Sequence, residues 1–216
     1  MIKSMLLCAL ATTPSSSLSQ FNRRSFLQKT SLAFSAIILP SLPSNAIDSN
    51  IKIGGKPQFG DEPLMSQKGH GTSASPVQSD LLYGVSNKQA DQICNFNRHF
   101  AERAGYFEST SFEDIVRNSK EPVTFFDSVT GKPLFVAPIG RSAEQFIAES
   151  QIHGWPSFRD SEVVWDNVRI LKNSGETVSV DGTHLGHNLP DRSGNRYCIN
   201  LVSVAGKPIA TATDSS

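Results

Sequence analysis

Two histidines and one cysteine in the C-terminal part of the chain are the side chains best suited to chemistry. His184 and His187 stand three residues apart, and Cys198 follows in the segment 196–200, which reads Arg-Tyr-Cys-Ile-Asn. A cysteine acts as a nucleophile only as the thiolate, and nearby cations lower its pKa from about 8.5. Arginine and protonated histidine are such cations. The grouping therefore predicts thiol chemistry at Cys198.

The spacing around the cysteine indicates a strand with one polar face. Arg196, Cys198 and Asn200 alternate with the larger residues Tyr197, Ile199 and Leu201. Because a strand points alternate side chains to opposite faces, the first three are expected to share one face and the others to enter the core. The competing interpretation is a buried cysteine that serves only as a small apolar residue.

Three motifs occur in a fixed order along this part of the chain. Gly154-Trp155-Pro156-Ser157-Phe158 precedes His184-Leu-Gly-His187, which precedes the cysteine segment. The set resembles the type B methionine-R-sulfoxide reductase family, whose motifs are GWPSF, HLGH and RYC[IV]N. The resemblance covers about 125–204. It implies the β fold of that family and a peptide-methionine (R)-S-oxide reductase, an oxidoreductase of protein repair under oxidative stress.

The resemblance also implies a role for each catalytic residue. Cys198 would attack the sulfoxide sulfur, which releases methionine and leaves a sulfenic acid. His184 and His187 would do the acid work, with a pKa near 6.5 that suits proton transfer at neutral pH. Asn200 would orient the sulfoxide.

Three further residues are assigned to substrate binding by the same resemblance. Trp155 would receive the methyl group beside the sulfur, since aromatic rings contact soft sulfur favourably. Phe158 would complete an apolar wall, and Arg196 would face the substrate from the cysteine strand. The alternative for Trp155 and Phe158 is plain core packing.

The chain departs from the family pattern at its metal site. Many members carry two CxxC pairs that bind a structural zinc, but the matched positions here are Asp127, Thr130, Val178 and Asp181. These residues cannot form a thiolate zinc site. The chain therefore resembles the zinc-free branch, and neither a metal nor an organic cofactor is expected.

A second departure concerns recycling of the sulfenic acid. Many members place a resolving cysteine or threonine immediately before GWPSF, where this chain has His153. Cys94 is then the other thiol outside the first 46 residues. It is either a resolving cysteine on a flexible N-terminal segment or a buried helix residue. In the second case thioredoxin, glutaredoxin or glutathione must act directly on Cys198.

A third departure is the 18 residues between Phe135 and Gly154, more than the family pattern has. The capping pair Ser142 and Gln145 predicts a helix there, to about Gln151. This helix would cover the substrate pocket, and Arg141 and Glu149 would then select the peptide that enters. The alternative is a solvated surface helix.

The first 46 residues have the composition of a targeting presequence. They contain no Asp or Glu, and Arg23-Arg24 precedes the apolar run 31–42 and the small-residue site 44–46. This resembles a twin-arginine export signal. With the earlier apolar stretch 5–11, it resembles the bipartite presequence of a chloroplast protein bound for the thylakoid lumen; bacterial periplasmic export is the alternative. The main run is shorter than the roughly 20 residues of a spanning helix, so stable membrane insertion is not expected after processing.

The rest of the chain is expected to form one domain after a linker. Residues 47–80 are rich in Gly, Pro, Ser and Gln and predict a flexible linker, and 81–210 would be the catalytic domain. Ser86 and Gly105 bound a predicted helix over 87–104. Strand candidates are 123–128, 134–137, 163–171, 177–180 and 197–204, the first two as a hairpin. The expected fold is mainly β, with antiparallel sheets, an N-terminal helix and short flanking helices.

Two other functions fit the same residues. His184, His187 and Cys198 could bind a soft transition metal in a metal-binding or sensing protein. The second is that of a catalytically degenerate domain, which binds oxidised methionine without reducing it. The chain has 20 basic and 20 acidic residues, and this balance gives no indication of nucleic-acid binding.

Overall fold

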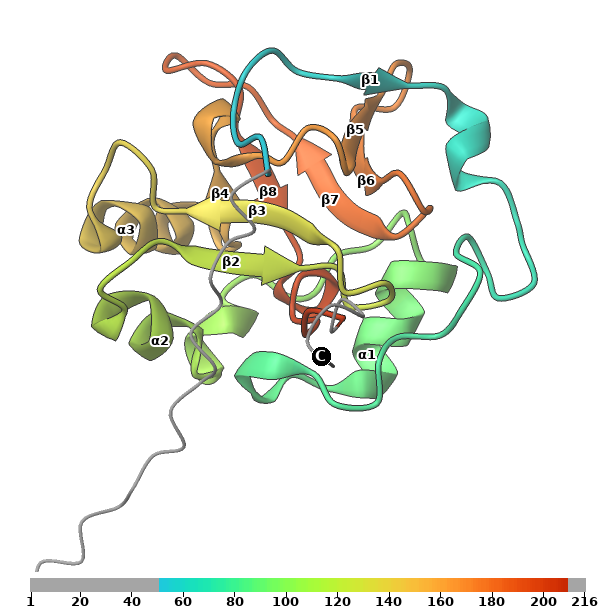
Figure 1. Ribbon diagram of the computed structural model, residues 1–216, viewed down its shortest axis with the longest axis horizontal. Helices are drawn as coiled ribbons and strands as arrows, with labels where there is room; N and C mark the ends of the chain where they lie inside the picture. The colour runs from blue at the N-terminus through green and yellow to red at the C-terminus, as the bar shows by residue number, and fades with distance from the viewer. Residues whose placement is uncertain (1–50, 210–216) are drawn as a thin grey trace, which may run out of the picture. The chain divides into compact units, whose positions relative to one another are not determined.

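Strands form two sheets, and the computed structural model describes them within residues 51–209 (Figure 1). The larger sheet has six strands in the order β1-β5-β6-β7-β8-β4, and the smaller sheet pairs β2 with β3. β1 runs parallel to β5, and the other pairs are antiparallel. The strands are β1 Phe59–Gly60, β2 Val123–Phe126, β3 Pro133–Ala137, β4 Ser157–Phe158, β5 Val168–Leu171, β6 Glu176–Ser179, β7 His184–Asn188 and β8 Tyr197–Ile199. The mainly β fold expected from the sequence is confirmed.

Local sequence signals place the hairpin and the longest helix correctly. β2 and β3 form the predicted antiparallel hairpin. α3, Ala143–His153, begins with the predicted capping box, in which Ser142 and Gln145 bond each other's backbone. It ends at Gly154, whose φ of 84° is the left-handed conformation that favours glycine. A shorter helix, α2 (Phe112–Asn118), was not expected.

The predicted helix over 87–104 is too long. Ser86 caps the helix as expected, but α1 spans only Asn87–Asp91 and continues as a single π-helical stretch, Gln92–Phe96. Residues 97–104 are irregular, because hydrogen bonds hold the Glu102 side chain against a distant part of the chain. Its buried carboxylate accepts hydrogen bonds from the backbone N–H groups of Leu201 (2.8 Å) and Val202 (3.3 Å).

The segment expected to be a flexible linker is instead part of the domain from residue 51 onward. β1 adds to the edge of the large sheet, and Met65 is buried against Leu171 and Val178. Thr72 donates its backbone N–H to Asn95 at 3.1 Å. Backbone hydrogen bonds, which have no signature in hydrophobic periodicity, hold this segment. The presequence expected over 1–46 lies outside the described residues.

One face of the large sheet carries the main core. Aromatic rings from the hairpin, α2, α3 and β4 pack there: Phe112, Phe125, Phe135, Phe146 and Phe158 are all fully buried. Figure 1 shows the hairpin lying across the large sheet, with α2 and α3 at one end of it. Within residues 51–209, no helix has the length and apolar character needed to cross a bilayer.

The strand limits differ from the sequence prediction in the C-terminal half. The candidate over 163–171 is a strand only from Val168, and the one over 197–204 ends at Ile199, before a 3-10 helix at Leu201–Ser203. β7, which contains both histidines, was not predicted as a strand at all. The geometry of the site depends on this strand.

Candidate active site

Four side chains form one straight row across the large sheet. Cys198 on β8 lies directly opposite His187 on β7 and, on its other side, Ser157 on β4. His187 in turn lies opposite Glu176 on β6. Directly paired residues of antiparallel strands point to the same face, with Cβ atoms roughly 4.5 to 5.5 Å apart. The row therefore brings the thiol, an imidazole, a hydroxyl and a carboxylate together.

Gly186 explains how closely β7 and β8 pack beside this row. A Cβ atom on Gly186 would lie 2.0 Å from the carbonyl oxygen of Cys198 and 3.0 Å from Cα of Ile199. No side chain fits there, so the glycine between Leu185 and His187 is required by the close approach of the two strands.

A β-bulge places both histidines on the same side of the sheet. The pairing of β6 with β7 shifts between Thr177 and Val178, so that one residue of β7 is extra. In a regular strand His184 and His187 would point to opposite faces. With the bulge, their ring centroids lie 5.9 Å apart at 80°, in an edge-on arrangement.

His184 differs from the sequence expectation in its protonation. It is 1% exposed, and burial, followed by repulsion from His187, lowers its pKa to about 3. The Ile93 backbone partly offsets this effect, but neither ring nitrogen has a hydrogen bond of ordinary geometry within the described part of the chain. His184 is therefore neutral at pH 7 and cannot act as an imidazolium acid. The prediction of a pKa near 6.5 is wrong for this residue.

Cys198 is held by two polar neighbours in a mostly buried position. Arg196 donates a hydrogen bond from Nη1 to its Sγ atom, and the Ser157 hydroxyl lies 3.9 Å from the sulfur. Burial raises the pKa of the Cys198 thiol, and the charge and hydrogen bond of Arg196 offset that rise only in part. The expected positive field therefore comes from Arg196, and the thiol is still mainly protonated at neutral pH.

Arg196 is itself held in place by an alternating series of charges. Its Nε donates to Asp191 at 3.2 Å, and Asp191 also accepts from Arg159 at 2.8 Å. Arg159 pairs in turn with Glu149. Because its guanidinium bonds Cys198 and Asp191, Arg196 orients the thiol, whereas the sequence assigned it to the substrate.

The alternating series of charged side chains that begins at Arg196 ends in the core beneath α3. Arg141 pairs with Glu149 and, at 2.6 Å, with Glu162, which is fully buried. Arg141 also donates to the Ser157 carbonyl at 2.7 Å. Arg141 and Glu149 thus fasten α3 to β4. The outer side of α3 is solvated, with exposed side chains at Glu144, Gln145, Ala148, Gln151 and Ile152. The selection of peptides by Arg141 and Glu149 stays a prediction.

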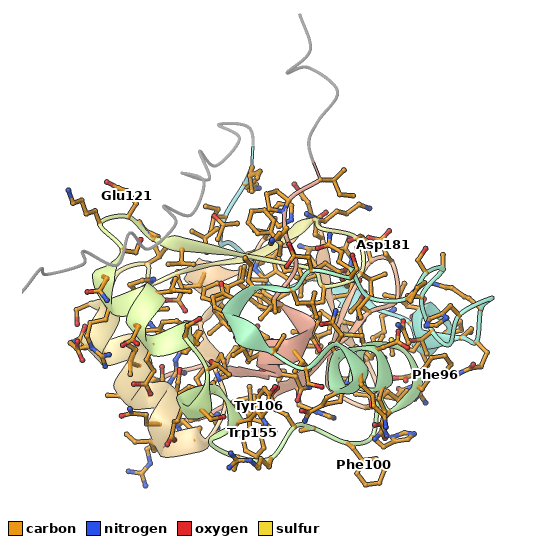
Figure 2. The ribbon with its side chains drawn as sticks, turned by 90° about the horizontal axis from the view of Figure 1, so that it is seen from below. Phe96, Phe100, Tyr106, Glu121, Trp155 and Asp181 are labelled. Atoms are coloured by element: carbon orange, nitrogen blue, oxygen red, sulfur yellow. The ribbon has the colours of Figure 1, made fainter. Side chains whose placement is uncertain are left out.

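Asn200 and Trp155 are joined to the site through Glu102. The Asn200 amide donates to the Leu185 carbonyl at 3.0 Å and accepts the backbone N–H of Glu102 at 2.9 Å. The Trp155 indole donates to the Glu102 carbonyl at 3.1 Å. Trp155 is half-buried at the surface, on the side where Figure 2 also places Tyr106. Sequence reasoning missed Glu102, because only the fold brings it to these partners.

Phe158 is not part of an apolar wall around the substrate. It is fully buried and stacks on Phe135 with ring centroids 4.3 Å apart. The alternation along β4 explains the error, because Ser157 faces Cys198 and the next residue must point to the other face, into the core. The core-packing alternative was correct for Phe158.

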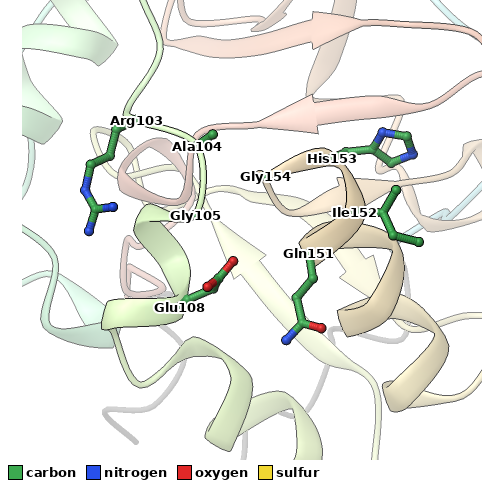
Figure 3. Close-up of a pocket in the computed structure, with 8 residues that line it drawn as sticks. All are labelled: Arg103, Ala104, Gly105, Glu108, Gln151, Ile152, His153 and Gly154. Atoms are coloured by element: carbon green, nitrogen blue, oxygen red, sulfur yellow. The ribbon is translucent and has the colours of Figure 1, made fainter. Parts of the chain in front are cut away.

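An open pocket of about 370 Å³ lies beside Trp155 (Figure 3). One wall consists of residues 103–105 with Glu108, and the other of residues 151–154 at the end of α3. A backbone hydrogen bond from Gly105 to Gly154, 2.8 Å long, connects the walls. Figure 3 shows the Glu108 and Gln151 side chains between them. His153, at the position matched to a resolving cysteine, lines this pocket.

Cys94 is not on a flexible segment. It lies in the π-helical stretch after α1, is fully buried, and contacts the Ser203 hydroxyl at 3.6 Å. Burial raises the pKa of its thiol strongly. Both Cys94 and Cys198 are free thiols. The buried interpretation is therefore correct, and Cys94 is a poor resolving nucleophile in this conformation.

Three of the four positions matched to the zinc pairs, Asp127, Thr130 and Asp181, lie in two turns that the fold brings together, and the fourth, Val178, is buried on β6. The buried Asp127 carboxylate accepts from the Thr183 hydroxyl at 3.0 Å, and Lys132 pairs with Asp181 at 2.9 Å. These polar contacts connect the turn after β2 with the turn before β7. They do so without any cysteine.

One group of metal-ligating side chains occurs among the described residues. Glu149, His153 and Asp191 have ligand atoms within 4.8 Å of one another, whereas His184, His187 and Cys198 do not form such a group in that part of the chain. Arg159 already pairs with both carboxylates and supplies the positive charge there.

Comparison with known proteins adds no assignment. The chain matches no family model and no curated protein.

Proposed function

We propose that the chain is a peptide-methionine (R)-S-oxide reductase that uses Cys198 as its nucleophile. The observation that carries the proposal is the direct pairing of Cys198 with His187 on one side and Ser157 on the other. Three motifs far apart in the sequence contribute to that row. The preference for the R form rests on the resemblance of these motifs to the type B reductases.

The chemistry begins at the Cys198 sulfur. The thiolate attacks the sulfoxide sulfur while a proton is delivered to the sulfoxide oxygen. The oxygen is transferred to Cys198, which becomes a sulfenic acid, and methionine leaves as the thioether. The cysteine sulfur is oxidised by two electrons and the sulfoxide is reduced by two.

His187 is the histidine placed to move the proton. It is half-buried and directly opposite Cys198, whereas His184 is buried and neutral. His187 takes the thiol proton and returns it to the sulfoxide oxygen. Arg196 stabilises the thiolate formed in between.

Recycling uses an external thiol. The thiol attacks the sulfenic acid and releases water, and a second thiol reduces the resulting mixed disulfide. Thioredoxin, glutaredoxin and glutathione supply such thiols. The buried position of Cys94 supports this route over an internal disulfide.

The test is the reduction of separate R and S diastereomers of a dabsylated methionine sulfoxide by the full chain with dithiothreitol. We expect turnover of the R form alone, lost in Cys198→Ser and retained in the matched variant Cys94→Ser. Folded, reduced protein that turns over neither form, or a Cys198→Ser variant that keeps the activity, would overturn the proposal.

The raised pKa of the Cys198 thiol favours one second candidate, a domain that binds oxidised methionine without reducing it. Trapping with dimedone separates the two functions. A reductase yields the dimedone adduct of Cys198 after addition of sulfoxide, whereas a binding domain leaves the thiol unmodified while the sulfoxide stays bound.

A further inference from the structure

We propose that Glu176 is a positioning residue for His187, so that Cys198, His187 and Glu176 act as one unit across three adjacent strands. The inference rests on the proposed function and extends it to a residue outside the three motifs. Glu176 lies on β6, opposite His187 in the same row that contains Cys198.

The geometry of the sheet places the three groups within reach of one another. Neighbouring strands are about 4.8 Å apart, and directly paired side chains share one face. His187 thus stands between Cys198 and Glu176 in the row. One ring nitrogen can serve each neighbour, which is the arrangement by which a carboxylate fixes a histidine tautomer in hydrolase triads.

The contacts of Glu176 do not explain why a carboxylate is buried at this position. It is 2% exposed, and its Oε2 atom has no hydrogen-bond partner within residues 51–209. The other oxygen lies 3.8 Å from Nδ1 of His99, a side chain that is 73% exposed. A buried carboxylate oxygen without a donor is costly, and its presence calls for an explanation. The missing donor is supplied when His187 turns an N–H group toward it.

The proposed role is electrostatic. When His187 takes the proton of Cys198, the imidazole becomes a cation beside the buried carboxylate, which stabilises it until the proton moves to the sulfoxide oxygen. The other titratable and charged groups around this position are His184 on the same strand, Arg196 beside the thiol, and Arg98 and His99 on the segment after α1.

The test compares Glu176→Gln with His99→Asn, which removes the exposed neighbour of the same carboxylate. We expect Glu176→Gln to lower kcat at least about tenfold with little change in KM, and to move the acid limb of the pH profile of kcat to lower pH. His99→Asn should leave both unchanged. In the double variant Glu176→Gln/His187→Asn, kcat should equal that of His187→Asn alone, because the carboxylate acts through the histidine.

A second readout keeps the inference separate from the reductase assignment. The pH profile of iodoacetamide alkylation at Cys198, followed on its peptide by mass spectrometry, should change in Glu176→Gln even if no sulfoxide is reduced. An unchanged profile, or losses of kcat that add in the double variant, would overturn the role of Glu176. Absence of sulfoxide turnover together with a changed alkylation profile would instead overturn only the reductase assignment. Equal melting temperatures of wild type and Glu176→Gln verify that the variant is folded.

Discussion

Arg196 donates a hydrogen bond to the sulfur of Cys198 while its Nε is fixed by Asp191. Arg196 immediately precedes β8, and Cys198, two residues later, points to the same side. Burial disfavours the thiolate, and Arg196 is the cation that opposes this effect. The Arg196 guanidinium, together with the Ser157 hydroxyl, therefore favours the thiolate of Cys198 against burial.

Loss of that guanidinium should slow reactions of the thiolate. In Arg196→Met the pKa of Cys198 rises further, because the Arg196 charge no longer opposes burial. Each unit of pKa lowers the thiolate fraction at neutral pH about tenfold. We expect iodoacetamide alkylation of Cys198 at pH 7.5 to slow at least about tenfold, while the exposed neighbour variant Arg192→Met reacts like wild type. Coincident alkylation profiles for the two variants would show that Arg196 does not activate the thiol.

His184 should make the protein sensitive to acid. Its folded pKa of about 3 lies below the unfolded value near 6.5. The stabilising contribution is therefore complete above pH 6.5 and is lost as the pH falls toward 3. His184→Gln should show a smaller drop in free energy of unfolding between pH 7 and pH 4.5, measured by urea titration. The exposed variant His99→Gln serves as the control and should follow wild type; if His184→Gln also follows wild type, the buried histidine is not the cause.

Local signals in the sequence predicted the elements that depend on near neighbours. The capping box at Ser142 and the apolar runs on either side of the turn at Gly131 suffice for α3 and the hairpin. Alternation in the cysteine segment also placed Arg196 beside Cys198. Each of these features is determined within a few residues, where spacing alone carries the information.

Long-range contacts determined what the sequence could not predict. Alternation along one strand would have separated His184 from His187, and the bulge that unites them is a property of the pairing with β6. The same kind of contact ends the helix after Phe96, since Glu102 bonds backbone groups nearly a hundred residues later in the chain. Phe158 was assigned to the pocket because a motif does not state which face of a strand is core.

Cys94 should contribute to stability and not to turnover. Its thiol is fully buried among polar and apolar contacts near Ser203. We expect Cys94→Ala to lower the free energy of unfolding by roughly 1 kcal/mol, while kcat with thioredoxin as the reductant stays within twofold of wild type. Accumulation of Cys198 sulfenic acid in Cys94→Ala, detected with dimedone during turnover with thioredoxin, would identify Cys94 as a resolving cysteine after all.

Glu102 should give the protein an opposite dependence on pH. Burial raises its pKa to about 7 from an ordinary value of 4.5. The folded state therefore favours the protonated carboxyl, and the resulting stability is complete below pH 4.5 and is lost as the pH rises through 7. In Glu102→Gln the side chain stays neutral, so this loss is absent.

The measurement is the difference in free energy of unfolding between wild type and Glu102→Gln at pH 5, 6, 7 and 8. The wild type should lose stability relative to the variant by an amount on the order of 3 kcal/mol over this titration. The contributions of Asp127 and His184 cancel, because both proteins contain them. Since Glu102 also holds Trp155 and Asn200, its ionisation should be visible in the fluorescence of Trp155. A difference that does not vary with pH would mean that the Glu102 carboxyl is already ionised at pH 5.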